Sequence, residues 1–144
     1  MPFVKIFIHF VWTTKNRKPF LDSRQLREKV WQHIQENSVK KGVHVDTIGG
    51  YQDHCHCLIK LGIDQTASKV MQLLKGESSY WINKELLTKS KFGWQDEYYG
   101  HSVSESGLGN VRRYIQNQEE HHRKTTFGEE YRKLFGGDGA LDVP

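Results

Sequence analysis

The stretch Asp53-His54-Cys55-His56-Cys57-Leu58-Ile59, in the middle of a 144-residue chain, decides which fold is expected. Its apolar run is typical of a buried strand, and successive side chains of a strand point to opposite faces of the sheet. His54 and His56 therefore share one face, and Cys55 and Cys57 share the other. Two imidazoles side by side on a rigid backbone form half of a metal site.

The histidine pair has two interpretations at this stage. Buried, hydrogen-bonded histidines without a catalytic role are common, whereas a His-x-His pair directly after Asp53 is also typical of metal binding. A zinc site would need four ligands around one tetrahedral centre. Because the two thiols point away from the two imidazoles, one ion cannot collect all four side chains. Zinc is the weaker interpretation.

Outward from this strand, the hydrophobic pattern predicts three more strands. Alternation is cleanest over residues 3–13, which are apolar on both faces, as in a central strand. Residues 43–48 form the next strand, and Gly49-Gly50 a turn or bulge before the histidine strand at residues 53–61. A short strand is predicted over residues 98–103.

Helical periodicity occupies the segments between and after these strands. The first helix, capped by Asp22 or Ser23, runs to about residue 40. The later helices are predicted over residues 66–86, with a kink near Gly76, over residues 111–124 and over residues 129–135.

The element order is strand, helix, strand, strand, helix, strand, followed by additional helices. This order predicts an α+β fold, a ferredoxin-like (βαββαβ) antiparallel sheet with helices on one face plus C-terminal helices. The first and third strands lie in the middle of such a sheet, so the histidine pair is expected at the centre of its open face. Residues 1–135 are expected to form a single domain, and residues 136–144 a flexible tail.

The composition permits a nucleic-acid partner without requiring one. The formal charge is +4 and the isoelectric point about 9.0, values that many plain enzymes share. The only two cysteines are neighbours on one strand face and poorly placed for a disulfide, which favours a reducing, cytoplasmic location. Residues 1–12 are too short and too interrupted by polar groups for a membrane span.

A second pattern lies on the predicted helix over residues 111–124. Tyr114 and Gln118 are one turn apart and project from the same face, and His121 or His122 continues that stripe. The other interpretation is a solvated, charge-rich surface helix, because apolar anchoring is thin.

Taken together, the two patterns resemble a known family. A His-hydrophobic-His strand followed by Tyr-x-x-x-Gln on a helix is similar to the single-tyrosine HUH transposases of bacterial insertion sequences, and most similar to the REP-associated tyrosine transposases. One departure is Cys55, where the family usually has a bulkier apolar residue; a free cysteine packs as a small hydrophobe. The matching stretches are residues 9–15, 49–56, 74–79, 94–95 and 114–122.

The resemblance implies an enzyme that cleaves and rejoins single-stranded DNA with hairpin-bearing ends. Tyr114 would be the nucleophile of a covalent 5′-phosphotyrosine intermediate, which leaves a free 3′-hydroxyl. His54, His56 and Gln118 would hold Mg²⁺ or Mn²⁺ against the scissile phosphate.

The resemblance also implies a homodimer, and exchange of the tyrosine helices between its subunits is one arrangement of it. Gly107 and Gly109 would then form the joint before the exchanged helix. Trp94, Tyr98 and Tyr99 could stack on unpaired bases, although most aromatic residues of a small domain are core. Phosphate contacts compete with the ordinary interpretation of surface cations as solvated side chains. The candidate phosphate contacts are Lys15, Arg17, Lys18, Lys75, Lys89, Lys91, Arg112 and Arg113.

Two other functions are compatible with the same residues. A ferredoxin-like sheet is also the scaffold of non-catalytic, single-stranded nucleic-acid-binding modules, but those stack bases on aromatic residues where this chain has histidines. A metal-dependent hydrolase that forms no covalent intermediate would not need Tyr114.

Overall fold

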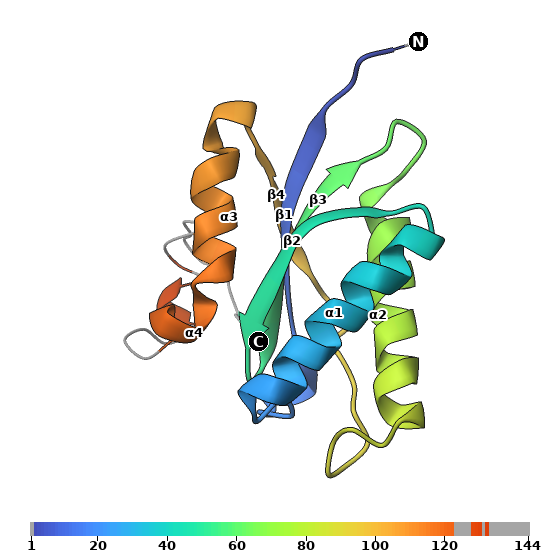
Figure 1. Cartoon of the computed structure of the whole chain (residues 1–144), viewed down its shortest axis with the longest axis vertical. Coiled ribbons are helices and arrows are strands. Elements are labelled where there is room, and N and C mark those ends of the chain that lie inside the picture. Colours follow the sequence, from blue (N-terminus) through green and yellow to red (C-terminus); the bar gives the residue numbers. More distant parts are fainter. Residues whose placement is uncertain (1, 123–127, 131, 133–144) are drawn as a thin grey trace.

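The computed structural model describes residues 2–122, 128–130 and 132. A four-stranded antiparallel sheet forms its centre (Figure 1), in the order β2-β3-β1-β4. The predicted ferredoxin-like α+β fold is confirmed, with the histidine strand next to the first strand in the middle of the sheet. The strands are β1 (Ile6–Thr13), β2 (His44–Tyr51), β3 (His54–Leu61) and β4 (Tyr99–Val103).

One face of the sheet carries the main hydrophobic core. Helices α1 (Arg24–Lys40) and α2 (Ala67–Lys84) cover this face, and their N-caps are Ser23 and Thr66. Full burial of each large apolar side chain stabilises the fold by about 1.5–3 kcal/mol. The core side chains of the sheet include Phe10, Trp12, Cys55, Cys57 and Ile59.

The two cysteines lie on this core face, as the strand period predicts. Both thiols are fully buried, and burial raises their pKa values well above the usual range. A thiol held protonated is a poor nucleophile and a poor metal ligand. Neither cysteine therefore contributes to the chemistry of the histidine face.

The histidine face of the sheet is covered, which corrects the expectation of an open face. Helices α3 (Leu108–Gln116) and α4 (Gln118–His121) lie on it, on the left in Figure 1. Leu108 and Ile115 of α3 pack against Leu58 of β3 and form a second apolar cluster. Leu108 lies upstream of the predicted helix start at residue 111, so sequence reasoning underestimated the apolar anchoring of this helix.

Three local predictions also differ from the structure. Gly49 and Gly50 belong to strand β2, where they pair with His56 and Cys55, and the register shift lies instead between residues 45 and 47. Helix α2 is continuous through Gly76 and ends at Lys84.

The predicted helix over residues 111–124 is instead split at Asn117 into α3 and α4. Gly107 belongs to the short 3-10 helix η2 (Glu105–Gly107), and Gly109 lies inside α3. Residues 128–130 and 132 are helical; residue 131 and the predicted tail lie outside the described residues. Within the described ranges, no helix has the length and apolar character needed to cross a membrane.

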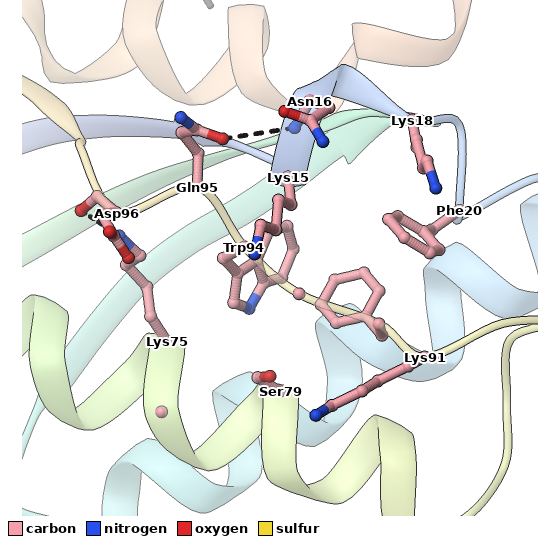
Figure 2. A pocket seen from close by; sticks show the side chains of 13 residues that line it. Lys15, Asn16, Lys18, Phe20, Lys75, Ser79, Lys91, Trp94, Gln95 and Asp96 are labelled. Atoms are coloured by element: carbon pink, nitrogen blue, oxygen red, sulfur yellow. Dashed lines mark hydrogen bonds between the residues drawn. The ribbon is translucent and has the colours of Figure 1, made fainter.

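β1 ends in a tight turn beside a cavity. The 3-10 helix η1 (Lys15–Arg17) has left-handed backbone at Asn16 (φ 58°) and Arg17 (φ 54°), a conformation that costs free energy in residues with a side chain. Hydrogen bonds stabilise this turn, among them Asn16 N–H to Gln95 Oε1 (3.2 Å) and Lys15 N–H to the Gly93 carbonyl (2.8 Å). A cavity of about 560 Å³ opens between η1, α2 and residues 91–96 (Figure 2).

Candidate active site

His54 and His56 lie side by side on the covered face of β3. Both are fully buried, and their ring centroids are 5.1 Å apart. β3 is flanked on both sides by paired strands, so the backbone that carries the two imidazoles is rigid. Such a pair can present two nitrogen ligands with little further loss of conformational entropy on binding.

Asp53 orients the first histidine. Its Oδ1 accepts a hydrogen bond from His54 Nδ1 (2.8 Å), and its Oδ2 lies 3.5 Å from Arg17 Nε. Burial opposes ionisation of Asp53, but the hydrogen bond from His54 and the nearby charges outweigh it, and the pKa of Asp53 is lowered. With Nδ1 engaged in this way, His54 directs Nε2 into the site, which is the usual carboxylate support of a metal-binding histidine.

His9 orients the second histidine. His9 Nε2 lies 2.9 Å from His56 Nδ1, and His56 Nε2 lies 3.2 Å from a carboxylate oxygen, which can only accept. His56 Nε2 therefore carries the proton in this state, and His9 donates to His56 Nδ1. Burial is the main cause that lowers the pKa of His56 to about 4 and that of His9 to about 2. Both rings are neutral near pH 7, as metal ligation requires of His56.

Tyr114 and Gln118 reach the histidines of the same chain. The ring centroids of Tyr114 and His56 are 5.5 Å apart, and Gln118 Oε1 lies 3.3 Å from His54 Nε2. Gln118 Nε2 donates to the Tyr114 carbonyl oxygen (3.2 Å), so the two side chains stay adjacent although the helix breaks between them. The structure thus brings together all four residues of the predicted catalytic and metal-binding set. One chain supplies them all.

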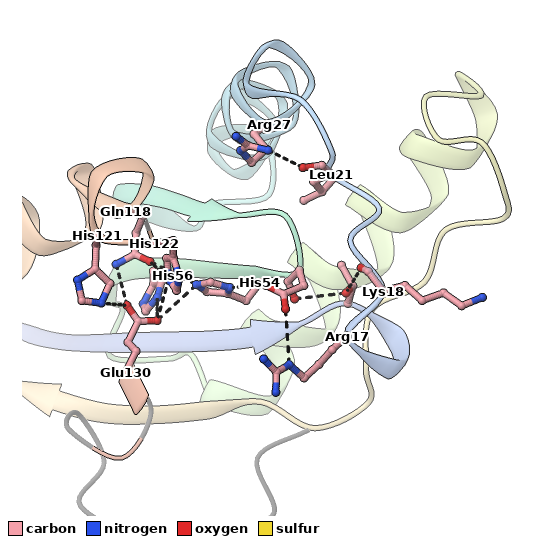
Figure 3. A network of polar contacts seen from close by, with 12 residues as sticks. Arg17, Lys18, Leu21, Arg27, His54, His56, Gln118, His121, His122 and Glu130 are labelled. Carbon is pink, nitrogen blue, oxygen red and sulfur yellow. Dashed lines mark hydrogen bonds and ion pairs between the residues drawn. The ribbon is translucent and has the colours of Figure 1, made fainter. Parts of the chain in front are cut away.

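Glu130 is the main feature that sequence reasoning missed. Its side chain is 1% exposed, and its carboxylate points into the cluster of imidazoles from residues 128–130 (Figure 3). Oε1 lies 3.2 Å from His56 Nε2 and 3.4 Å from His54 Nε2. Oε2 accepts hydrogen bonds from the Tyr114 hydroxyl and from Gln118 Nε2 (3.0 Å). No spacing rule in the sequence links position 130 to the histidine strand.

His122 completes the cluster next to α4. Its Nε2 lies 3.0 Å from Gln118 Oε1 and 3.4 Å from Glu130 Oε1, and its ring stacks on Tyr51 at 5.1 Å. The stripe that continues from Tyr114 through Gln118 thus includes His122, one of the two predicted alternatives. His121 also contacts the carboxylate, at 3.2 Å from Glu130 Oε2.

Burial and hydrogen bonds shift the pKa values of the ionisable groups in the site. Burial disfavours the charged form of Glu130, but hydrogen bonds from His122, His54 and His56 outweigh it and lower its pKa far below the usual range. Burial likewise opposes the charge on His54, yet its hydrogen bonds to Asp53 and Glu130 raise its pKa. The pKa of Tyr114 is raised by burial first and then by the charge of Glu130, so its phenol holds the proton in this state.

The donor atoms of the site fit a divalent ion. One ligand atom each from His54, His122 and Glu130 lie within 4.8 Å of one another. Imidazole nitrogens together with carboxylate and amide oxygens suit Mn²⁺ well, and their oxygens suit Mg²⁺. The predicted ligands His56 and Gln118 border the same group of atoms, so their role as ligands stays a prediction.

Four of the predicted DNA contacts line the cavity of Figure 2, Lys91 among them. The amine of Lys75 donates to the main-chain carbonyls of Asp96 (2.7 Å) and Glu97 (3.4 Å), and these hydrogen bonds help to hold the loop that contains Asp96 and Glu97. Burial lowers the pKa of Lys75. Lys15 and Lys18 line the opposite side, on and just after η1.

The three predicted arginine contacts each have a protein partner. Arg17 faces Asp53, Arg112 makes two hydrogen bonds to Asp46, and Arg113 bonds Asn110. Trp94 lines the cavity but is 7% exposed and donates from Nε1 to Ser78 Oγ (2.9 Å). It is chiefly a core residue and not a platform for stacked bases.

Comparison with known proteins decides which family this site belongs to. The family model described as "Transposase IS200 like" matches residues 3–118, which include the histidine pair, the tyrosine and the glutamine. The chain belongs to the IS200-like transposase family. A search of curated proteins finds no significant match.

Solved structures agree with the fold of this transposase family. A Deinococcus radiodurans R1 protein assigned as a transposase is similar with a TM-score of 0.65 and 20% identity, over 81% of this chain and 93% of the other. A REP-associated tyrosine transposase bound to a REP hairpin is similar with a TM-score of 0.62 and 17% identity, over 100% of this chain and 91% of the other. The resemblance to single-tyrosine transposases inferred from the motifs is confirmed.

Proposed function

We propose that this transposase-family chain cleaves and rejoins single-stranded DNA through a covalent 5′-phosphotyrosine on Tyr114. The observation that carries the proposal is the position of the Tyr114 hydroxyl, which one carboxylate, Glu130, links to His54 and His56. A nucleophile separated from two candidate metal ligands by a single side chain is close enough for metal-assisted phosphoryl transfer.

The proposed reaction conserves one phosphodiester bond at each step. The Tyr114 oxygen attacks the phosphorus, its proton passes to a neighbouring acceptor, and the bond from phosphorus to the 3′ oxygen breaks. The 3′ oxygen leaves as a hydroxyl group after taking up a proton. Attack of a 3′-hydroxyl on the phosphotyrosine reverses these steps and rejoins the strand without a separate energy source.

His54, His56 and Gln118 are the proposed holders of Mg²⁺ or Mn²⁺, at the site that the donor atoms fit. Such an ion, when bound, neutralises charge on the scissile phosphate and stabilises the transition state. Asp53 and His9 orient the two imidazoles through hydrogen bonds of 2.8 and 2.9 Å, which favours one productive geometry.

The proposed substrate is single-stranded DNA that carries a hairpin. The similar REP-associated transposase is bound to a REP hairpin, and the lysine-lined cavity here begins at the end of β1, close to Asp53. A DNA substrate agrees with the cytoplasmic location expected from the cysteine usage. The homodimer that the resemblance implies stays a prediction.

A gel assay tests the proposal. The protein is incubated with end-labelled, hairpin-bearing single-stranded DNA and Mn²⁺ or Mg²⁺, and the products are separated under denaturing conditions. We expect a covalent protein–DNA band that Tyr114→Phe abolishes. Tyr80→Phe is the matched control, because Tyr80 is 67% exposed on α2, away from the site. It should keep the band.

The alternatives give different gels. Cleavage without any covalent band would indicate a hydrolase, and a band that survives Tyr114→Phe would move the nucleophile to another residue such as Tyr98 or Tyr99. Binding of the DNA with neither cleavage nor a covalent band, with either metal, would favour the non-catalytic nucleic-acid-binding module.

A further inference from the structure

Glu130 lies outside the ligand set that the family resemblance implies, yet its carboxylate occupies the centre of the site. The imidazoles of His54, His56 and His122 all direct Nε2 toward its Oε1, at 3.4, 3.2 and 3.4 Å. A carboxylate with a side chain only 1% exposed must be compensated by charges or hydrogen bonds, and this one has both. A buried carboxylate surrounded by three imidazoles is a candidate metal ligand.

The spacing of these atoms is that of neighbouring ligands around one ion. Metal–ligand bonds of about 2.0–2.2 Å place adjacent ligand atoms roughly 3 Å apart. The pairs His54 Nε2–Glu130 Oε1 (3.4 Å), His122 Nε2–Glu130 Oε1 (3.4 Å) and His122 Nε2–Gln118 Oε1 (3.0 Å) are close to this value. Three different segments, β3, α4 with its C-cap and residues 128–130, thus converge on one point.

The net charge of the predicted ligand set also favours a role for Glu130. A set of two imidazoles and one amide is neutral, so a divalent ion bound by it in a buried site would keep its full charge. Mg²⁺ and Mn²⁺ also prefer oxygen ligands, carboxylates above all. Glu130 supplies a negative charge and an oxygen at the place where the neutral donors meet.

We propose that Glu130 is a ligand of the divalent ion, with His122 beside it, and that these two residues extend the set formed by His54, His56 and Gln118. The inference rests on the proposed metal-dependent function. The second carboxylate oxygen of Glu130 accepts the hydrogen bond of the Tyr114 hydroxyl. Glu130 would thereby fix the position of the nucleophile relative to the ion.

Mn²⁺ binding to the DNA-free protein tests this role without any measurement of activity. Isothermal titration calorimetry and the electron paramagnetic resonance signal of free Mn²⁺ give the dissociation constant. Loss of residues that only support a ligand costs tenfold to a hundredfold in affinity. We therefore expect Glu130→Gln to weaken Mn²⁺ binding by at least about tenfold.

Glu129→Gln is the matched control, because it removes the same charge from the adjacent, exposed residue. It should bind Mn²⁺ like the wild type. Glu130→Asp keeps the charge and should retain more affinity than Glu130→Gln. Wild-type or tighter binding in Glu130→Gln would overturn the proposal, and tighter binding would show that the carboxylate competes with the ion.

A folding defect in Glu130→Gln would not leave the question open. Circular dichroism and the Mn²⁺-induced rise in Tm identify such a defect. The decision then passes to His122→Gln and Glu130→Asp, and wild-type affinity in both would overturn the proposal.

The outcome is distinct from that of the DNA assay. Tyr114→Phe should keep Mn²⁺ affinity within about twofold of the wild type, since a phenol is not among the proposed ligands. Weakened Mn²⁺ binding in Glu130→Gln together with no covalent DNA band in the wild type would leave this inference standing and remove the proposed function. A covalent band in the wild type with unchanged Mn²⁺ binding in Glu130→Gln would do the reverse.

Discussion

Gly49 determines how closely the tyrosine helix approaches the sheet. A Cβ at this position would lie 2.5 Å from the carbonyl oxygen of Ile115 and 3.2 Å from its Cγ2. The first of these atoms belongs to the backbone of α3 and cannot move unless the helix moves. The glycine therefore belongs to the architecture of the site, one residue along β2 from Gly50 and opposite His56.

Gly49→Ala is expected to displace α3 and to lower the free energy of unfolding by about 1–3 kcal/mol, the usual cost of overpacking. Tyr114 directly precedes Ile115 on this helix, so a displacement of the helix moves the tyrosine. Formation of the covalent band should therefore fall more than DNA binding does. Urea unfolding and the gel assay measure the two effects.

Gly76→Ala is the matched control for this substitution. Gly76 is in the interior of α2, and a Cβ there would meet no atom of another segment within 4 Å. The free energy of unfolding of this variant should therefore rise by about 0.5–1 kcal/mol. Equal stability of Gly49→Ala and the wild type would show that α3 is not held this close to β2.

At the scale of the elements, two ion pairs fasten α3 and α4 to the rest of the fold. Arg27 of α1 binds Glu119 of α4 at 2.6 and 2.9 Å and also donates to the Leu21 carbonyl. Arg112 of α3 donates to Asp46 of β2 through Nε (2.9 Å) and Nη2 (2.8 Å). The Arg112 pair holds α3 against β2, and the Arg27 pair holds α4 against α1.

The Arg112 pair predicts a pH dependence of stability. Hydrogen bonds from Arg112 lower the folded-state pKa of Asp46, while an unfolded Asp titrates near about 3.9. The pair therefore stabilises the fold above the unfolded pKa, and this contribution is lost as the pH falls through the lowered folded pKa. Asp46→Asn should therefore reduce stability more at neutral pH than at about pH 2.

Urea unfolding at the two pH values measures this effect, and hydrogen exchange over residues 108–116 locates it. Asp64→Asn, in the exposed loop after β3, is the control and should change neither. An equal loss of stability at both pH values would mean that Asp46 acts through packing and not through its charge.

At the scale of the whole molecule, the two faces of the sheet differ in what they carry. The face under α1 and α2 carries the main core, and the face under α3 and α4 carries the candidate site (Figure 1). The lysine-lined cavity lies at one end of the sheet, where η1 connects to Asp53 through the ion pair of Arg17.

Salt dependence tests whether the cavity binds DNA backbone. If Lys15 contacts a phosphate, Lys15→Ala should weaken single-stranded DNA binding and reduce the slope of log K against log salt by about 0.7. Fluorescence anisotropy from 50 to 300 mM salt measures the slope. Lys40→Ala, at the exposed far end of α1, should leave it unchanged. An unchanged slope in Lys15→Ala would exclude this contact.

The sequence alone determined the sheet, the strand order and the faces of the strands. The strands and their faces follow from alternation and local spacing, which act over a few residues, and the strand order was predicted from the order of the elements along the chain. For this reason His54 and His56 were placed on one face, the cysteines on the other, and Tyr114 one turn from Gln118. The family motifs then linked the two patterns.

Only the tertiary structure decided what meets the histidines. Glu130, His9 and the close approach at Gly49 depend on contacts between segments far apart in the chain, and no residue period encodes such contacts. The open sheet face was a wrong expectation for the same reason, since Leu58, Leu108 and Ile115 join only when α3 folds back. The local strand pattern thus placed His54 and His56 side by side, and long-range packing brought the Glu130 carboxylate next to both.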